Sequence, residues 1–517
     1  MRHCNHNRKR YVIRLFWLSF SISMFLILGV AISQPLNNLI PEKMFLYTMV
    51  WIGMYFGAWI FFSYLEQKIE NLMEIVKRYY TFYFVILGIV LFIVSCCLRS
   101  VPITDYENIY NAAKLYAMGE EVTNWDYFAR WTNNIGVMLL LSLLFYLCNW
   151  LPEQVDSYYF VLILNVLFIV LLVYCLHYLL NAFLTEDSAV VSLMTLFVCG
   201  TWIPFYANAS IFYSDQWSLG FAVYAFTLLV KGHSKLRWYF YYLCSGILLG
   251  LGISVKVTVA TIIVSLTITG FLFSEVWKNK RRMIIVLGGC VAYLSLFSVY
   301  TRTLPYQEWE GQLKAPVEYW FALGLVADGT YADNEEFAVY CLTAENYEQR
   351  REIAREKIKA EILNLWDGKH IIQKARQNFG AGDLGAARYF HIPVQENFLW
   401  NCCSMNGEYF WKYACVTTAF FFAVLFYMGV GGLLQFFKKD TTEEMGFFLA
   451  ALTFWGICLF MMLWEAQDKF MYNHSGWMII TLICSFKLID EQGRKFLKNI
   501  KGVVRTKDEC EQNTKVI

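Results

Sequence analysis

The sequence predicts an all-α polytopic membrane protein with about 12 transmembrane helices, a number set by the length of its apolar windows. Of its 517 residues, 58% are hydrophobic and only 16% are charged. A soluble domain of this size cannot bury so much apolar surface. The charged residues cluster in short connectors between long apolar windows, as a bilayer requires of helices that satisfy their own backbone hydrogen bonds. The net charge of +2 gives no reason to expect a nucleic-acid partner.

The apolar windows are each close to the roughly 20 residues that a spanning helix needs. They lie near residues 11–32, 44–65, 79–98, 134–151, 159–180, 188–206, 213–230, 238–254, 255–273, 282–300, 412–436, 446–464 and 470–488. The first window has a second interpretation, because the Ala-Ile-Ser near its end is typical of a signal-peptide cleavage site. Cleavage there would leave the remaining topology unchanged.

Short basic connectors predict the orientation in a plasma membrane. The positive clusters lie at Arg8–Arg10, Lys68–Arg78, Lys231–Arg237, Lys278–Arg282, Lys438–Lys439 and after residue 488. Placing them in the cytoplasm puts both termini there and the connectors 99–133, 207–214, 301–411 and 465–469 outside. The chain then divides into a membrane module (1–300), a large outer loop (301–411), C-terminal membrane helices (412–488) and a basic cytoplasmic tail (489–517).

One window must fail to cross, because three windows separate two connectors that are predicted to lie on the same side. We assign residues 188–206 as this re-entrant segment, since Gly200 and Pro204 can break a helix there. This choice leaves the twelve crossings.

Cysteine usage gives no sign of a disulfide framework or a metal site. Most of the 15 cysteines lie in apolar windows, no C-x-x-C occurs, and the 7 histidines are scattered. For the adjacent Cys402 and Cys403 we favour packing over a bridge. No metal ligands are predicted, and only a divalent cation stays open as a cofactor.

A short surface helix is predicted at residues 104–119 of the first large outer connector. Thr104 is a good N-cap with Glu107 three residues later, and Gly119 can end the helix. One apolar face would lie along the membrane surface, formed by Ile109, Ala112, Ala113, Tyr116 and Ala117. Asp105 then occupies the first turn. In the plainer interpretation, Asp105 and Glu107 only complement the helix dipole.

An arginine, a proline and then an acidic residue that opens an amphipathic helix resemble the first outer loop of multispanning glycosyltransferases of the C fold (GT-C). The likeness is greatest to the bacterial branch related to protein O-mannosyltransferases and aminoarabinose transferases (glycosyltransferase family 39). Four further segments resemble that branch in order along the chain, namely YFARWTNNIG (127–136), IFYSDQWSL (211–219), GLGISVKVTV (250–259) and LWEAQDKFMY (463–472).

The resemblance implies an enzyme that moves a sugar from a polyprenyl-phosphate donor to an extracytoplasmic glycan, lipid or protein. An inverting displacement needs a base for the proton of the acceptor and positive groups for the departing phosphate. Asp105 would be the base. A helix N-terminus keeps such a carboxylate ionised.

Lys256 is the first candidate for holding the donor phosphate, because it interrupts two apolar windows on the outer side. Snorkelling to lipid headgroups is its alternative role. Arg99 and Arg302, beside helix ends, and Lys469 are further candidates. The chain departs from the family at Val257, where relatives carry proline, and at Lys469, where they often carry arginine. Lysine keeps the charge and loses the bidentate fork.

Four residues are candidates for orienting the acceptor or the lysine. Asp215 opens a helix on the outer side, although Ser214 could instead be the cap of that helix. Glu107, Arg130 and Glu465 come from the motifs quoted above.

The outer loop 301–411 is predicted to select the acceptor. Within it, residues 345–366 predict a solvated, partly packed helix with an apolar set of Ile353, Ile358, Ile362 and Leu363. The glycine-rich stretch 379–390 lacks the arrangement of a phosphate-binding loop.

Other functions predict other patterns. A lipid-linked-sugar flippase or transporter would carry several ionisable residues near mid-bilayer and often repeated halves, and neither is visible. A polysaccharide polymerase or ligase shares the helix number and the large outer loop but usually depends on arginines in late outer loops. A membrane scaffold without activity would leave Asp105 free to vary.

Overall fold

The structure is a computed structural model that describes residues 2–36, 39–152, 156–184, 188–232, 237–273, 280–438 and 445–514. Across these ranges the chain is helical, and the only extended pairing is an isolated bridge between Ser100 and Pro393. The predicted all-α polytopic fold is therefore confirmed.

Eight helices of the described ranges are long and apolar enough to cross a membrane, and we call them the candidate spans. They are α1 (Arg2–Ser33), α2 (Pro41–Lys68), α3 (Leu72–Cys97), α7 (Ser157–Leu184), α12 (Trp238–Val255), α14 (Lys280–Thr301), α21 (Phe410–Phe437) and α22 (Met445–Leu463). The other windows coincide with the shorter helices α6 (Ile135–Cys148), α8 (Ala189–Gly200), α11 (Phe221–Gly232) and α13 (Thr261–Leu272), and with the long helix α23 (Ser475–Thr514). The number of twelve crossings stays a prediction.

The helix break predicted near Gly200 and Pro204 is present. Helix α8 ends at Gly200, and a new short helix, α9 (Ile203–Asn208), begins with Pro204 in its first turn. Proline fits there because the first amides of a helix have no intrahelical acceptor.

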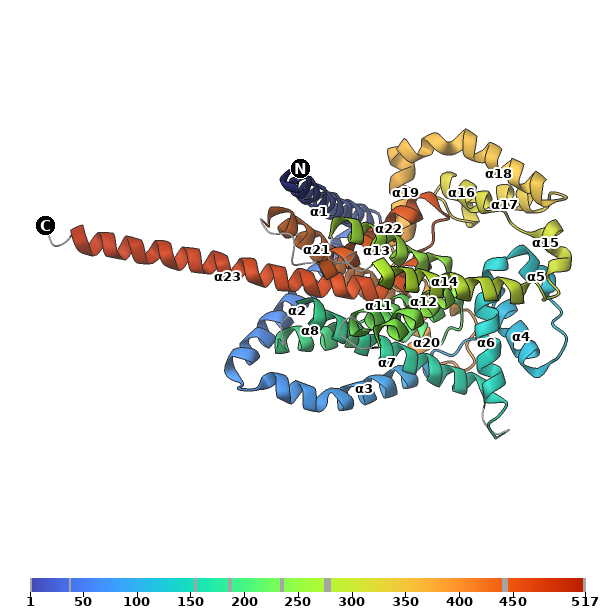
Figure 1. Cartoon of the computed structure of the whole chain (residues 1–517), viewed down its shortest axis with the longest axis horizontal. Coiled ribbons are helices and arrows are strands. Elements are labelled where there is room, and N and C mark those ends of the chain that lie inside the picture. The colour runs from blue at the N-terminus through green and yellow to red at the C-terminus, as the bar shows by residue number, and fades with distance from the viewer. Residues whose placement is uncertain are drawn as a thin grey trace.

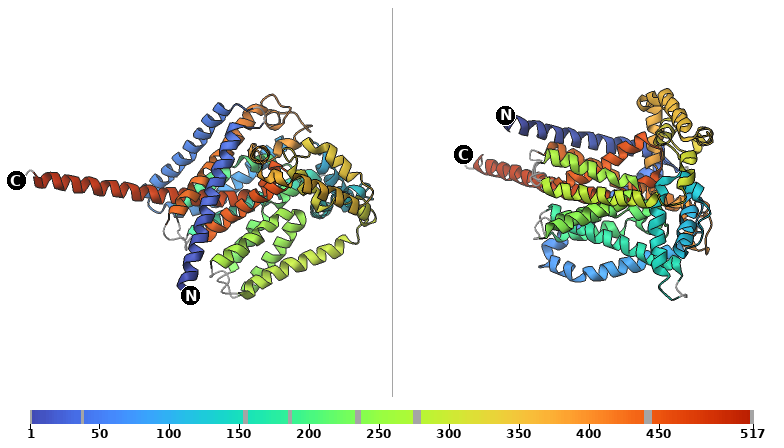
Figure 2. Two further views of the ribbon diagram at one scale, coloured as in Figure 1. Left: turned by 90° about the horizontal axis from the view of Figure 1, so that it is seen from above. Right: turned by 45° about the vertical axis from the view of Figure 1, so that its right-hand side comes forward.

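The first helix is part of the bundle. It runs alongside α21 (Figure 1), and its side chains Trp17, Phe20 and Met24 are fully or almost fully buried. At the other end of the chain, α23 continues as one helix to Thr514, and Figures 1 and 2 show it extending far from the bundle. The segment predicted as a basic tail is thus helical up to that residue.

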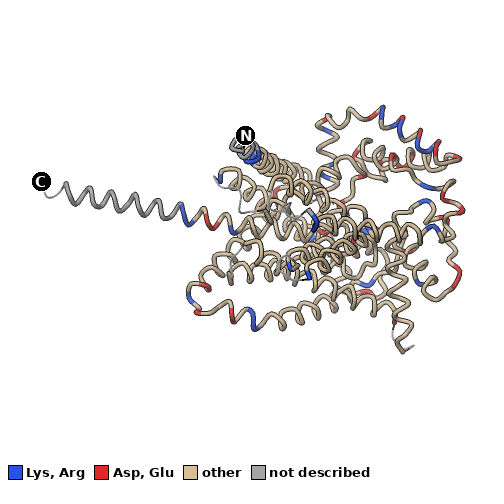
Figure 3. Tube along the Cα trace, viewed as in Figure 1, with Lys and Arg blue, Asp and Glu red and all other residues tan. Residues whose placement is uncertain are grey.

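The bundle has two different ends. Both termini lie toward one of them, which we call the tail end (Figure 2). The opposite end, which we call the loop end, carries the connectors 99–134 and 302–409. Figure 3 shows many Lys, Arg, Asp and Glu residues over the loop end and at the connection between α2 and α3, and few along the helices between.

The two large connectors form one layer at the loop end, although they lie far apart in the sequence. The backbone of Arg99 and Val101 exchanges hydrogen bonds with residues 392–394, with N–O distances of 3.1 and 2.9 Å. The Trp400 indole donates to the Ser100 hydroxyl at 2.9 Å. Bonds between distant segments of this kind hold the first connector in one position.

Part of the second connector builds a small domain with its own core. Its helices are α15 (Gln307–Leu313), α16 (Val317–Leu325), α17 (Glu335–Leu342) and α18 (Tyr347–Glu361), and its core includes Tyr319, Ala322, Leu323, Ala338, Cys341 and Ala354. The predicted helix at 345–366 is α18 followed by a 3-10 turn, η5 (Ile362–Trp366). Ile353 and Ile358 pack on the core, whereas Ile362 and Leu363 are exposed because the chain changes direction after α18.

The connector then returns to the bundle through α19 (Gly368–Phe379), η6 (Ala386–Tyr389) and α20 (Phe398–Cys403). Cys402 and Cys403 are free thiols, as predicted.

Helices α6 and α12 lie in close contact. A Cβ at Gly136 would lie 1.7 Å from the carbonyl oxygen of Ser254. Only glycine permits that contact, which brings the start of α6 beside the end of α12.

Candidate active site

Helix α4 (Thr104–Met118) begins where predicted but by a different device. The N-cap position is Ile103 without a side-chain bond, so the predicted Thr104 cap is wrong. Thr104 instead has a φ of 51°, in the left-handed region that costs a branched residue energy, and this turn immediately precedes Asp105. Gly119 ends the helix with a φ of 72°, as predicted.

The apolar face of α4 is covered by protein, where the sequence predicted contact with the membrane surface. Ile109, Ala112 and Ala113 are fully buried, and α4 packs against α6. Small residues at this face let the two helices approach, and the contact fixes α4 as a rigid support for its first turn.

Asp105 is half-buried and accepts two phenolic hydrogen bonds. The Tyr127 hydroxyl donates to Oδ1 at 2.8 Å and the Tyr213 hydroxyl to Oδ2 at 3.3 Å. Asn134 in turn donates to the Tyr127 oxygen at 2.7 Å. Burial, and then the charge of Asp105, raises the pKa of Tyr127, so its phenol stays protonated and remains a donor. No lysine or arginine among the described side chains forms an ion pair with Asp105.

Asp215 lies in α10 (Ser214–Ser218) and is fully buried. Lys256, the first residue after α12, extends its ammonium to 3.0 Å from each carboxylate oxygen. Ser214 does not cap the helix, and its hydroxyl lies 3.4 Å from the same ammonium. Asp215 is therefore paired with Lys256, and the role of Asp215 in orienting that lysine or the acceptor stays a prediction.

Lys469 approaches the same place from η7 (Asp468–His474). Its ammonium lies 5.1 Å from the ring centroid of Tyr213, and that of Lys256 lies 4.6 Å from the ring of Phe470. Aromatic faces attract ammonium groups without neutralising them. The Lys256 ammonium also lies 5.8 Å from the ring centroid of Tyr213, so both ammonium groups lie beside the tyrosine whose hydroxyl contacts Asp105.

Glu465 is buried, and the Gln467 amide donates to it. Burial raises the pKa of Glu465, and the nearby charge of Lys469 opposes this. Lys374 of α19 lies on its other side, fully buried, with its ammonium donating to the Gly324 carbonyl. Burial lowers the pKa of Lys374 to about 7. Glu465 is thus close enough to Lys469 and to Lys374 to interact electrostatically with both.

The glycine-rich stretch 379–390 contributes residues that the sequence analysis missed. Arg388 binds Asp468 through Nε at 3.1 Å and a terminal nitrogen at 3.0 Å, while its side chain stays 44% exposed. Asp383 accepts from the amide of Ala387 at 2.8 Å. Burial, and then the charge of Asp468, raises the pKa of Asp383 to about 6.

The backbone of this stretch explains why its glycines are needed. Leu384 and Gly385 have φ values of 51° and 82°, and a Cβ at Gly385 would lie 2.5 Å from the Cβ of Lys469. The glycines therefore let the stretch lie directly on η7. The sequence does contain a signal for these site residues, namely an aspartate and an arginine within a glycine-rich run. Comparison of that run with a phosphate-binding loop did not reveal it.

Aromatic rings join these parts. The ring centroid of Tyr389 lies 5.8 Å from that of Tyr213 and 6.2 Å from that of Tyr106. These rings connect α4, the residue before α10 and the glycine-rich stretch. Their packing holds the carboxylate of Asp105 in a fixed position relative to the lysines.

The structure thus brings together five of the predicted residues: Asp105, Asp215, Lys256, Lys469 and Glu465. Four others lie elsewhere. Arg99 pairs with Asp156 at 3.3 Å and stacks on Tyr158, with its guanidinium 4.0 Å from the ring centroid. Arg302 and Glu107 are exposed at helix ends. Arg130 lies toward the loop-end domain, where its backbone oxygen accepts from Ala315 and its charge lowers the pKa of Arg350, after burial as the main cause.

The cluster does not fit a bound metal ion. Within the described residues, no three His, Cys, Asp or Glu side chains converge as metal ligands. Asp215 is already paired with Lys256 and Asp468 with Arg388. We therefore derive no step through a divalent cation.

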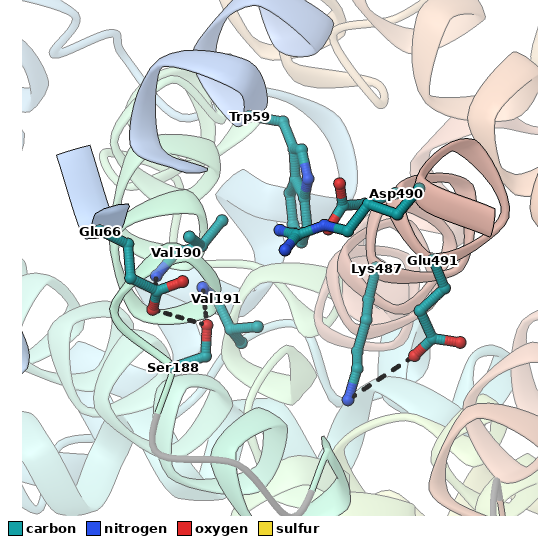
Figure 4. A pocket seen from close by; sticks show the side chains of 9 residues that line it. Trp59, Glu66, Ser188, Val190, Val191, Lys487, Asp490 and Glu491 are labelled. Carbon is teal, nitrogen blue, oxygen red and sulfur yellow. Dashed lines mark hydrogen bonds and ion pairs between the residues drawn. The ribbon is translucent and has the colours of Figure 1, made fainter. Parts of the chain in front are cut away.

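A cavity of about 470 Å³ lies at the tail end, far from the cluster (Figure 4). Its lining comes from α2, α8 and α23. Glu66 accepts from the amides of Ala189 and Val190 at 2.8 and 3.3 Å, which caps the start of α8. Lys487 lies 4.0 Å from Glu491. These carboxylates already have partners, and the cavity has no contact with Asp105.

No protein-family model matches this chain, and no curated protein does. Solved structures do align with it. The oligosaccharyltransferase AglB from Archaeoglobus fulgidus, in complex with an inhibitory peptide and a dolichol-phosphate, is 12% identical, with a TM-score of 0.39 over 82% of this chain and 52% of AglB. An Archaeoglobus fulgidus oligosaccharyltransferase tethered to an acceptor peptide is 10% identical, with a TM-score of 0.37 over 80% of this chain and 50% of that one.

ArnT from Cupriavidus metallidurans bound to undecaprenyl phosphate is 12% identical, with a TM-score of 0.30 over 80% of this chain and 79% of ArnT. The chain spans about half the length of both oligosaccharyltransferases. At these identities and TM-scores, nothing of their activity is transferred to this chain, whose function rests on its own residues.

Proposed function

We propose that this protein is a membrane glycosyltransferase that moves a sugar from a polyprenyl-phosphate donor to an acceptor outside the plasma membrane. The observation that supports this most is the position of Asp105, a half-buried carboxylate without an ion-pair partner among the described residues, beside two lysines gathered around Tyr213. A free carboxylate next to a cationic pocket is what a displacement of phosphate by a hydroxyl requires.

Asp105 acts as the base in an inverting displacement. The acceptor oxygen forms a bond to the anomeric carbon while the bond from that carbon to the phosphate oxygen breaks. The polyprenyl phosphate leaves with the electron pair, and Asp105 takes the acceptor proton late in the step. Hydrogen bonds from Tyr127 and Tyr213 hold the carboxylate in place.

Lys256 and Lys469 hold the phosphate of the donor and stabilise the charge that grows on it as the sugar departs. Asp215 positions Lys256, whose ammonium lies 3.0 Å from each carboxylate oxygen and donates to Oδ2. The half-exposed guanidinium of Arg388 supplies a third positive group from the glycine-rich stretch. The polyprenyl tail remains in the bilayer beside the spans, so donor and cluster meet at the loop end.

In this proposal the loop end faces outside, as the basic connectors predict. The variants Glu121→Cys and Glu396→Cys, both at exposed positions of the loop end, should react with an impermeant thiol reagent added to intact cells. Arg237→Cys and Arg281→Cys should react only after the cells are opened. The opposite pattern, measured against the background of the native cysteines, would overturn the orientation and with it the proposed acceptor.

The loop-end domain of α15 to α18 selects the acceptor. It is joined to the first connector by the bond from the Ala315 amide to the Arg130 carbonyl at 3.2 Å, and it lies beside the cluster. Arg130 and Glu107 are therefore assigned to acceptor contact rather than to the donor phosphate.

The test is a transfer assay with purified protein in lipid nanodiscs and membranes of a strain that lacks the protein as acceptor. A panel of polyprenyl-phosphate sugars carries radiolabel in the sugar, and label that leaves the organic phase is counted. We expect Asp105→Asn to abolish transfer of the one accepted sugar. Glu120→Gln, an exposed carboxylate just after the same helix, is the matched control and should retain it. Full transfer by Asp105→Asn at normal protein level would refute the assignment.

A further inference from the structure

Helix α19 lies across the loop-end termini of two candidate spans. Its Asn378 amide donates to the Met461 carbonyl near the end of α22 at 3.2 Å, and its Arg376 guanidinium lies 3.5 Å from the Pro35 carbonyl just after α1. A Cβ at Gly380, directly after the helix, would lie 2.9 Å from the Leu36 side chain. Because α1 ends at Ser33 and α22 at Leu463, α19 is at the depth where the apolar core of the bilayer ends.

The turn η5, at the start of α19, exposes large apolar side chains at this depth. Trp366 is 86% exposed, Leu363 is 75% exposed and Ile362 is 43% exposed. On the first turn of α19, Ile371 and Ile372 are exposed as well. Figures 1 and 2 show the corner between α18 and α19 at the edge of the loop-end domain that is nearest the helices of the bundle. Contact with water is unfavourable for large apolar side chains, so a cluster of them at the surface indicates that this surface contacts a membrane or another molecule.

The composition of the surface identifies its partner. Tryptophan is favoured at the boundary between lipid tails and headgroups, where its ring is buried and its N–H stays in a polar environment. Exposed Lys369 lies one turn beyond Trp366, and half-buried Arg376 lies two turns further along the same helix. Both can meet lipid phosphates. The other face of α19 is covered by protein, including buried His370, Lys374 and Phe379.

We propose that η5 and the first half of α19, residues 362–372, form an interfacial anchor that inserts Leu363 and Trp366 into the phospholipid leaflet at the loop end. The anchor fixes the height of α19 over the bilayer. Since α19 packs on η7, which carries Lys469, the same contact sets the height of the proposed phosphate site relative to the lipid-borne donor.

Photocrosslinking tests the anchor independently of sugar transfer. The photoreactive residue benzoylphenylalanine replaces Trp366 or Leu363 in the full chain, held in nanodiscs of phosphatidylethanolamine and phosphatidylglycerol. We expect a phospholipid adduct, detected by intact-protein mass spectrometry, at both positions. The positive control is Leu296, 72% exposed on the span α14, and the negative control is Tyr340, 65% exposed on α17 of the same domain.

Two outcomes would overturn the proposal. One is the absence of lipid adducts at 363 and 366 while Leu296 gives them. The other is a crosslink from these positions to a second protein chain, which would make the surface a protein interface. A double variant, Leu363→Ser with Trp366→Ser, tests how much these two side chains contribute to membrane contact. With the photoreactive residue placed at Ile372, the yield of lipid adducts should fall by at least about tenfold, because two apolar side chains no longer enter the lipid. Tyr340→Ser should leave that yield unchanged.

Discussion

Asp105 and Asp215 lie on either side of Tyr213 and have opposite surroundings. Asp215 is fully buried, and its charge is met by the ammonium of Lys256 at 3.0 Å. Asp105 is half-buried and accepts only from two tyrosine hydroxyls. Neutral donors hold a carboxylate in place without cancelling its charge, whereas an ion pair does both. This difference is why the proposed mechanism makes Asp105 the base and Asp215 the residue that positions a lysine.

Exchange of the two carboxylates for amides should separate these roles most strongly. Asp105→Asn should lower kcat by about 1,000-fold or more, the usual contribution of a general base, with little change in thermal stability. Asp215→Asn should instead lower the unfolding temperature, because it leaves the ammonium of Lys256 without a counter-charge. Transfer assays and thermal unfolding in detergent measure the two effects. Equal losses of activity with equal losses of stability would end the distinction.

Removal of the lysine alone should be the next largest effect. Lys256→Met leaves the buried Asp215 unpaired and is expected to cost about 3–5 kcal/mol of stability. The double variant Asp215→Asn with Lys256→Met should recover part of this loss, because it leaves no buried charge. Both should lack activity. Additive destabilisation in the double variant would show that the two residues do not act as a pair.

Variants of Lys469 test which cation near Asp105 and Asp215 binds the phosphate of the donor. Lys469→Met should raise the KM for the polyprenyl-phosphate sugar about 10- to 100-fold, the range for one hydrogen bond to a charged group, with a smaller change in kcat. Lys469→Arg keeps the charge and restores the bidentate fork, so it should retain the low KM. If the methionine variant binds donor normally, the phosphate lies nearer Arg388 and Lys256.

Substitution of Asp383 should have the smallest effect, a change in stability that depends on pH. Its pKa is raised from 3.8 to about 6, so between these values the folded protein holds a proton that the unfolded chain has released. Stability therefore falls as pH rises through this window and stays lower above it. Asp383→Asn should be more stable than the parent at pH 7, by about 1–3 kcal/mol, and equal to it below pH 4. Thermal unfolding at both pH values measures this. A difference that does not depend on pH would assign the effect to packing instead.

Much of the fold could be predicted because a bilayer leaves few choices. Apolar windows of spanning length correspond to helices or helix pairs throughout the described chain, and the break at Gly200 lies where glycine and proline predicted it. The start and end of α4 were also predicted, although Ile103 rather than Thr104 is its N-cap. Local patterns determine such features, since each depends on residues within a few positions of one another.

The candidate site could be predicted only where a polar residue interrupted an apolar window or opened a helix. Lys256 and Asp215 were found in this way, and their pairing was among the roles expected. Arg388, Asp468 and Asp383 were missed because they lie in connectors, where charged residues are ordinary, and the glycine-rich run around Asp383 and Arg388 was compared only with a phosphate-binding loop. Arg99 and Arg302 shared the pattern of Lys256, and the folded chain directs them elsewhere.

The sequence by itself determined that this chain is a helical membrane protein, roughly where its apolar helices lie, and which early helix presents Asp105. Only the tertiary structure decided that the glycine-rich stretch 379–390 lies on η7, that the apolar face of α4 packs on α6, and that Asp215 rather than Asp105 takes the charge of Lys256. The physical reason is that helix formation follows from neighbouring residues. Ion pairs and close backbone contacts depend on segments tens of residues apart, such as Asp215 with Lys256 and Gly385 with Lys469, whose meeting no local pattern records.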